Sequence, residues 1–356
     1  MTRRRATRAT VPSTSRPRPV PVAEPESQPF VPPYPASWLD RLTRQVDRLP
    51  GPYWTPYLVA GLAFLGLAAL FLNLEGESLT AAIIFAHSVP FYGFWLLHYL
   101  DRRAAASLEE YRPAFTGSGA DLRDVRWRLT TLPARPAAVV SLVSLLLSIT
   151  VSVTWTLDSP FTVLDRFLFY LADVFAGLYV YHSIRQLRLV NRLYATSTRV
   201  DLHNVAPLHA FSTLSAQTAI GGLLIISAGV LITPEGFVGA FLPAGILFAV
   251  LAVLAFLLPL MGLHRRLVRA KDEELSDLSR RWQACMSEVY RRLDQGDLSA
   301  ADRINTTLSA LERARAVIER IPTWPWRPET LRGLVAALLL PVTIWLVQYG
   351  LQRLLG

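Results

Sequence analysis

Seven apolar stretches of membrane-spanning length constrain this chain more than any other feature of its sequence. An α-helix needs about 20 apolar residues to cross a hydrocarbon core of ~30 Å. Six of the stretches meet this length without interruption, whereas the seventh has Pro341 at its middle, so it either spans with a kink or stops short. The sequence therefore predicts an all-α, polytopic membrane protein with six or seven transmembrane helices. The stretches are 53–73, 79–99, 137–157, 162–183, 214–233, 237–262 and 331–351.

Arginine alternates between the loops that connect these stretches. Loops 74–78, 158–161 and 234–236 contain neither Arg nor Lys. Cytoplasmic loops are enriched in these residues, so we expect a cytoplasmic N-terminus, three short external loops and, with seven spans, an external C-terminus. The arginine-rich segments are 41–48, 100–136, 184–213 and 263–330.

The charge balance follows from this topology. The net charge is +9, and Lys271 is the only lysine among the 36 basic residues. Arginines that flank spans have a topological role first, so we expect the lipid bilayer as a partner and no nucleic acid. The single cysteine, Cys285, excludes an intramolecular disulfide and a cysteine-based zinc site.

The N-terminal segment differs from the rest in composition. Residues 1–36 are rich in proline and arginine, which predicts a disordered cytoplasmic tail. The piece that follows, "ASWLDRLTRQVDRL", places Trp38, Leu39 and Leu42 near one helix face, and we expect it to lie on the membrane surface. Residues 37–262 then form a membrane domain that contains the first six spans.

Residues 263–321 form the one sizeable polar part, and its apolar residues recur at near-heptad spacing. Gly296 interrupts the pattern, and Ser299 is suited to cap a second helix. The pattern predicts a cytoplasmic antiparallel helical hairpin with a coiled-coil-like seam. The seam buries only one stripe, so we expect a partner helix from loop 100–136 or a second copy of the chain. The seam residues are Leu275, Leu278, Trp282, Cys285, Val289 and Leu293, and then Ile304, Leu308, Leu311, Ala314, Ile318 and Ile321.

A proline- and tryptophan-rich joint, "PTWPWRP" at 322–328, connects the hairpin to the last apolar helix at 329–356. Pro322 ends the preceding helix, Pro325 prevents a new one, and Pro328 suits the first turn of the next. Seven residues reach at most ~23–25 Å, which is enough to return the chain to the membrane. We expect Trp324 and Trp326 to lie at the membrane interface, where indoles are enriched.

Two ionisable residues fall inside apolar stretches. Asp173 lies about 12 residues into the fourth span, and an acid at that depth usually faces the bundle interior with a partner. His87, in the second span close to Pro90, has a similar depth and is the candidate partner. The pair indicates either a hydrogen bond that helps packing or an ion or proton site.

Five further histidines fall at the cytoplasmic ends of spans, where they could gather at one level. A metal or haem would use such a set, but no spacing is diagnostic, and histidines at the interface are the ordinary interpretation. We expect no metal and no cofactor. Short catalytic motifs are absent from the sequence, so no catalytic residue is assigned and enzymatic activity is not expected. The histidines are His98, His182, His203, His209 and His264.

Two stretches, "VDLHNVAPLHAFSTLSAQTAIG" and "IERIPTWPWRPETLRGLVAALLLPVTIWLVQ", resemble segments of uncharacterised multi-pass bacterial membrane proteins with a PTWPW-type segment before the last hydrophobic helix. The resemblance covers the C-terminal half and implies a helical inner-membrane protein without a known activity. Our leading hypothesis is a non-enzymatic assembly, scaffold or signal-coupling protein that acts through its cytoplasmic hairpin. The alternative is a transporter or channel built on His87 and Asp173.

Overall fold

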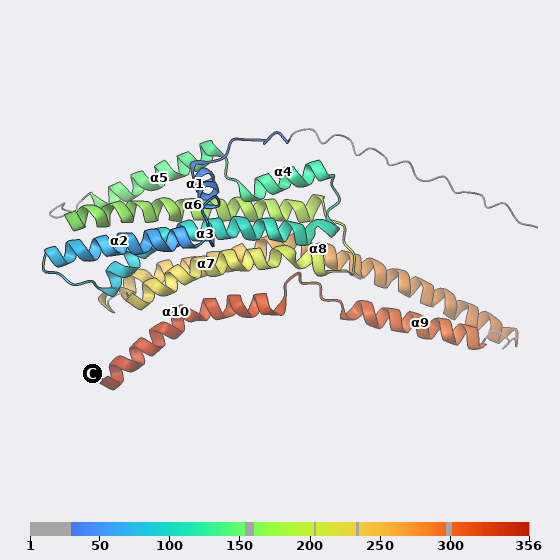
Figure 1. Cartoon of the computed structure of the whole chain (residues 1–356). Coiled ribbons are helices and arrows are strands. Elements are labelled where there is room, and N and C mark those ends of the chain that lie inside the picture. Colours follow the sequence, from blue (N-terminus) through green and yellow to red (C-terminus); the bar gives the residue numbers. More distant parts are fainter. Residues whose placement is uncertain (1–29, 154–159, 203, 233–234, 297–300, 356) are drawn as a thin grey trace, which may run out of the picture. The chain divides into compact units, whose positions relative to one another are not determined.

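The computed structural model describes residues 30–153, 160–202, 204–232, 235–296 and 301–355. Within these ranges the chain is helical, with no strand longer than an isolated bridge, so the predicted all-α fold is confirmed (Figure 1). Short 3₁₀ turns stand at Arg112–Ala114 and Ala206–His209. The α-helices are α1 Trp38–Val46, α2 Thr55–Leu74, α3 Ala81–Tyr111, α4 Gly119–Thr130, α5 Ala134–Ser152, α6 Pro160–Thr196, α7 Ala210–Ile232, α8 Glu235–Asp294, α9 Ala301–Arg320 and α10 Pro328–Leu355.

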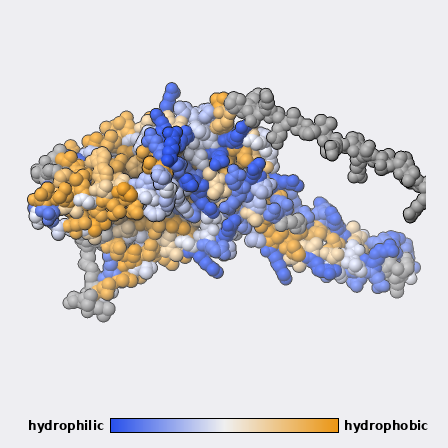
Figure 2. Space-filling view, viewed as in Figure 1, coloured by the Kyte–Doolittle hydropathy of each residue, from blue (hydrophilic) through white to orange (hydrophobic). Residues whose placement is uncertain are grey.

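Six helical segments in the described part of the chain are long and apolar enough to cross a membrane, which confirms a multi-pass membrane protein. They lie in α2, α3, α5, α7, α8 and α10. Helix α6 is not among them, although its 37 residues exceed the length of a span and it packs against α3, α5 and α8. Figure 2 shows apolar side chains over one end of the helices and hydrophilic ones over α4 and the α8–α9 hairpin.

Helix α7 is the central helix of the bundle. It packs against α3, α8 and α10, and 61% of its most apolar window is buried, against 11% for α5 and for α10. Large side chains such as Phe211 on α7, Tyr194 on α6 and Phe256 on α8 are fully buried in one cluster. The helices at the periphery therefore meet lipid, while α7 holds the bundle together.

The structure corrects one expectation for the N-terminal region and shows what α1 packs against. Residues 32–36 are ordered rather than part of a tail, because the Tyr34 hydroxyl donates to the Thr131 carbonyl and Ala36 forms a bridge with Pro133. Helix α1 packs on the bundle with its apolar face, since Leu39 is buried and the Trp38 indole donates to Ser141 on α5. The rest of the predicted tail, residues 1–29, lies outside the described residues.

The hairpin has the predicted form, and α8 runs without interruption for 60 residues into it. Helix α9 returns along α8, and Gly296 before the connection has a φ of +68°, a conformation that glycine adopts without strain (Figure 1). The seam residues of the first helix are half-buried, except Leu293, which is exposed. The expected cap at Ser299 lies outside the described residues.

Loop 100–136 does not supply the predicted helix partner for the hairpin. Its helix, α4, packs on α3 and α6 instead. The last helix, α10, begins at Pro328 as predicted and continues through Pro341 to Leu355, with a bend that is visible in Figure 1. Proline inside a helix removes one backbone hydrogen bond, which accounts for the bend.

Candidate functional site

A cluster of acids and histidines, all buried or partly buried except Asp47, crosses the bundle at the end from which the hairpin extends, which we call the hairpin side. His98 on α3 is 3% exposed, and its Nε2 lies 3.2 Å from an oxygen of Asp47. Its Nδ1 lies 2.9 Å from the Tyr57 hydroxyl of α2. Arg102, one turn further along α3, approaches the same Asp47 oxygen at 2.9 Å. Asp47 therefore ties the end of α1 to α3.

A second pair lies on the same stretch of α3. Asp101 is three residues from His98, and one of its oxygens lies 3.3 Å from Nε2 of His182 on α6, a ring that is 1% exposed. The contact is close, but it is not aligned as a hydrogen bond, and neither ring nitrogen of His182 has another hydrogen-bond partner among the described residues.

Asp40 on α1 completes this cluster, which we call the polar layer and define as Asp40, Asp47, His98, Asp101 and His182. One carboxylate oxygen of Asp40 accepts three hydrogen bonds, from the Ser37 amide at 2.9 Å, the Ser37 hydroxyl at 2.5 Å and the Leu132 amide at 3.0 Å. Burial raises the pKa of the Asp40 carboxyl above its ordinary value, and the hydrogen bonds oppose that shift.

The sequence missed the acids of the polar layer, although a signal was present. Asp101 follows His98 at a spacing of three, which places both side chains on one face of a helix. Only the packing of α3 against α1 and α6 shows that each histidine has its own carboxylate.

The described histidines do not gather into one site. His98 and His182 share the polar layer, but His264 stacks on Trp324 and His209 lies near the charge of Arg327. Residue 203 is outside the described part of the chain. In that described part, no group of three or more His, Cys, Asp or Glu side chains has the geometry to hold a metal ion.

His87 and Asp173 are not brought together. His87 is fully buried, and its Nδ1 lies 2.9 Å from the Ile83 carbonyl of its own helix. The acid within its electrostatic range is Asp165, eight residues before Asp173 on α6. Among the described residues, no hydrogen bond or ion pair joins His87 to Asp173, and Asp173 itself is half-buried.

The joint is fastened by a stack of four rings. Trp324 lies between His264, with ring centroids 3.9 Å apart and planes inclined by 9°, and Trp326, at 4.4 Å and 13°. Trp326 in turn stacks on Phe256 of α8 at 5.8 Å. We call these four residues the ring stack. The predicted place of the indoles at the interface is thus refined, because they pack on α8 rather than standing free.

Polar contacts reinforce the joint on both sides. The Lys271 ammonium donates to the carbonyls of Glu319 at 2.7 Å and Ile321 at 3.0 Å, which are orphaned at the end of α9. His264 Nδ1 lies 3.0 Å from the Thr323 carbonyl. The hairpin is therefore closed at its base by α8 itself.

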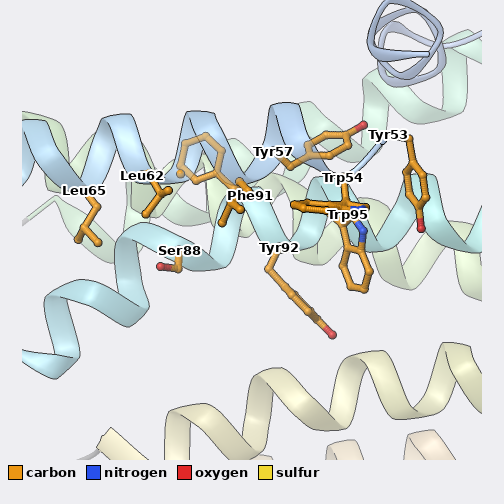
Figure 3. A pocket seen from close by; sticks show the side chains of 11 residues that line it. Tyr53, Trp54, Tyr57, Leu62, Leu65, Ser88, Phe91, Tyr92 and Trp95 are labelled. Carbon is orange, nitrogen blue, oxygen red and sulfur yellow. The ribbon is translucent and has the colours of Figure 1, made fainter. Parts of the chain in front are cut away.

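An aromatic groove between α2 and α3 opens beside the polar layer and encloses about 440 Å³. Figure 3 shows Leu62 and Leu65 facing Phe91 and Ser88 at one end, with Tyr53, Trp54 and Trp95 at the other. Tyr57 belongs to both features, since it lines this groove and contacts His98.

Comparisons of the chain with protein-family models, with curated proteins and with solved structures found no match. What the geometry defines is a class, a polytopic helical membrane protein with a helical hairpin outside its apolar region.

Proposed function

We propose that this protein is a non-enzymatic assembly or signal-coupling protein of the bacterial inner membrane, and that it acts through the α8–α9 hairpin in the cytoplasm. The observation that carries the proposal is the ring stack. It clamps the returning end of the hairpin to the same helix that leaves the membrane, so α8, α9 and the start of α10 move as one lever.

Both ends of the hairpin are attached to the bundle, which fits a role in signal coupling better than a role as a passive scaffold. Helix α8 packs against α6 and α7 in the bundle, and α10 packs against α7. A tilt of α7 would therefore reach the hairpin through both of its connections at once. Coupling of this kind requires two states of the bundle, and the test is whether both exist.

The distribution of arginine supports a cytoplasmic hairpin, because the short connecting loops lack basic residues. The single native cysteine makes the test simple. In a Cys285→Ser background, Tyr290→Cys on the hairpin, 61% exposed in the native chain, should react with an impermeant maleimide only in inside-out vesicles. Glu77→Cys in the α2–α3 loop should react only in right-side-out vesicles. The opposite pattern would reverse the orientation.

Assembly would use the apolar side chains that the hairpin leaves exposed. Tyr290 and Leu293, which stand one turn apart on α8 close to its end, are 61% and 54% exposed. A photo-crosslinker at position 293 should give one discrete adduct in native membranes, whereas the matched position Arg313 should give none. Tyr290→Glu, one turn before the crosslinker on the same helix, should abolish the adduct. Equal labelling from positions 293 and 313 would contradict assembly through this face.

A transporter or channel remains the alternative, and one observation favours it. Asp173 stands in α6, which packs within the bundle, and has no hydrogen bond or ion pair among the described residues; an unpaired acid at membrane depth would cost about 2.5–3.5 kcal/mol. Proton or ion flux into liposomes that falls at least tenfold with Asp173→Asn, but not with Asp165→Asn, would establish this function. Equal flux in the two variants and the native protein would remove it.

A further inference from the structure

A second groove, between α6, α7 and α8, encloses about 510 Å³ and is not part of the site described above. Its walls are apolar and open outward, with Ile184 on α6 and Leu254 and Leu258 on α8 exposed by 47%, 42% and 55%. The volume lies within the usual range of ligand sites in proteins. The groove faces lipid along the apolar part of the bundle and is therefore accessible from the membrane.

Small residues of α7 make the floor of this groove, and a contact between α6 and α8 ends it. Gly222 on the floor lies so close to the Tyr179 hydroxyl that a Cβ at this position would be 2.9 Å away. On the hairpin side, Asn191 approaches Gly262, where a Cβ would meet its side-chain oxygen at 2.6 Å. The groove therefore has a floor of small side chains and ends at the contact of Asn191 with Gly262, and an acyl chain can lie along it.

Positive charge gathers at the closed end. Arg188 lines the groove there, and Arg192 follows one turn later on α6. Arg265 lies on α8 directly after the contact at Gly262. All three are exposed, and none forms an ion pair with an acid in the described part of the chain. The groove of Figure 3 differs, because its nearest cation, Arg102, is neutralised by Asp47.

We propose that this groove binds an anionic phospholipid of the surrounding bilayer. One acyl chain lies between α6 and α8 over the floor of α7, and the phosphate meets Arg188 with the Asn191 amide beside it. The unpaired cations select the occupant, because an apolar helix of a second copy would leave them without a counter-charge, whereas a phosphodiester supplies one. The proposal requires only that the bundle spans a membrane, and it is independent of what the hairpin does.

Native mass spectrometry of the full chain in detergent tests the proposal with two probes, phosphatidylglycerol and phosphatidylcholine with identical acyl chains. We expect the native protein to retain phosphatidylglycerol preferentially. Arg188→Gln should reduce that preference about fivefold, the effect of one surface arginine on an anionic headgroup. Arg188→Lys should keep most of the preference, which shows that charge and not folding is measured. Arg48→Gln, an exposed arginine that follows α1 and lies outside the groove, is the matched control.

A larger side chain in the groove tests the site proposed for the acyl chain. Leu254→Trp narrows this groove and should lower retention of both lipids, whereas Leu62→Trp in the groove of Figure 3 should leave the preference for phosphatidylglycerol unchanged. Equal effects of Arg188→Gln and Arg48→Gln would overturn the headgroup assignment. If inorganic phosphate displaced the lipid completely, the site would be for soluble anions, and if Leu254→Trp changed only the oligomeric state, the occupant would be a second copy.

Discussion

Replacing Trp324 with alanine should detach the returning end of the hairpin. The indole is stacked on both faces, against His264 at 3.9 Å and Trp326 at 4.4 Å. Each aromatic pair contributes about 0.5–1.5 kcal/mol beyond the area it buries, so the loss of two pairs amounts to ~2 kcal/mol for local opening. That free energy corresponds to roughly a thirtyfold larger population of the open joint.

Hydrogen exchange of the protein in lipid nanodiscs measures this opening directly. Amides between residues 314 and 327 should exchange about thirtyfold faster in Trp324→Ala, while those of the central helix α7 keep their protection. Trp345→Ala is the matched control, because this indole lies on α10, is 42% exposed and stacks only on Tyr349. Unchanged exchange at the end of α9 would refute the clamp, and a uniform rise that includes α7 would indicate global destabilisation instead.

Two further predictions concern the polar contacts. Lys271→Ala removes both donors to the last carbonyls of α9, which should cost about 1–2 kcal/mol locally and speed exchange at residues 316–321 alone. Asp40→Ala leaves three donors unsatisfied and should lower the free energy of unfolding by about 2–4 kcal/mol, whereas Asp40→Asn keeps one acceptor oxygen and should cost less than about 1 kcal/mol. The folded state raises the pKa of the Asp40 carboxyl above its ordinary value of 3.8. The stability that this group contributes is therefore fully present below pH 3.8 and is lost as the pH rises through the raised pKa. In a denaturation series from pH 4 to pH 8, the free energy of unfolding of the native protein should fall with pH, and this pH dependence should be absent in Asp40→Asn.

Local sequence signals predicted six of the seven apolar spans and the helix breaks of the hairpin, whereas the predicted span at 162–183 lies in α6, which is not among the candidate membrane spans of the described residues. The thickness of the bilayer sets the apolar length that a span requires, and Pro328 and Gly296 act on the backbone at their own positions. These features can therefore be predicted without knowing which helices contact one another. Helix ends were less predictable, since α3 continues as a polar helix to Tyr111, well beyond its apolar run.

Contacts between distant segments could not be read from local patterns. Tyr34 belongs to a proline-rich stretch, yet it is ordered by a hydrogen bond to a residue 97 positions away. The pairing of Asp101 with His182 likewise depends on the rotation of two long helices, which hydropathy does not specify. His87 and Asp173 show the reverse case, because similar depth in the membrane does not bring two side chains together.

The ring stack and the ion pair between Arg327 and Glu110 both hold the joint, and the structure indicates which of them matters more. The two charges lie 3.5 Å apart, but their side chains are 45% and 39% exposed. Water and salt screen such a pair, so it is worth about 0–1 kcal/mol, less than the ~2 kcal/mol of the two stacked contacts of Trp324. Glu110→Gln should therefore change exchange at the end of α9 less than fivefold, and raising the ionic strength should have little effect on the native protein. If Glu110→Gln accelerated exchange at the end of α9 as much as Trp324→Ala, the ion pair between α3 and the joint would be the main contact that holds the joint. The hairpin would then follow movements of α3 rather than those of α8.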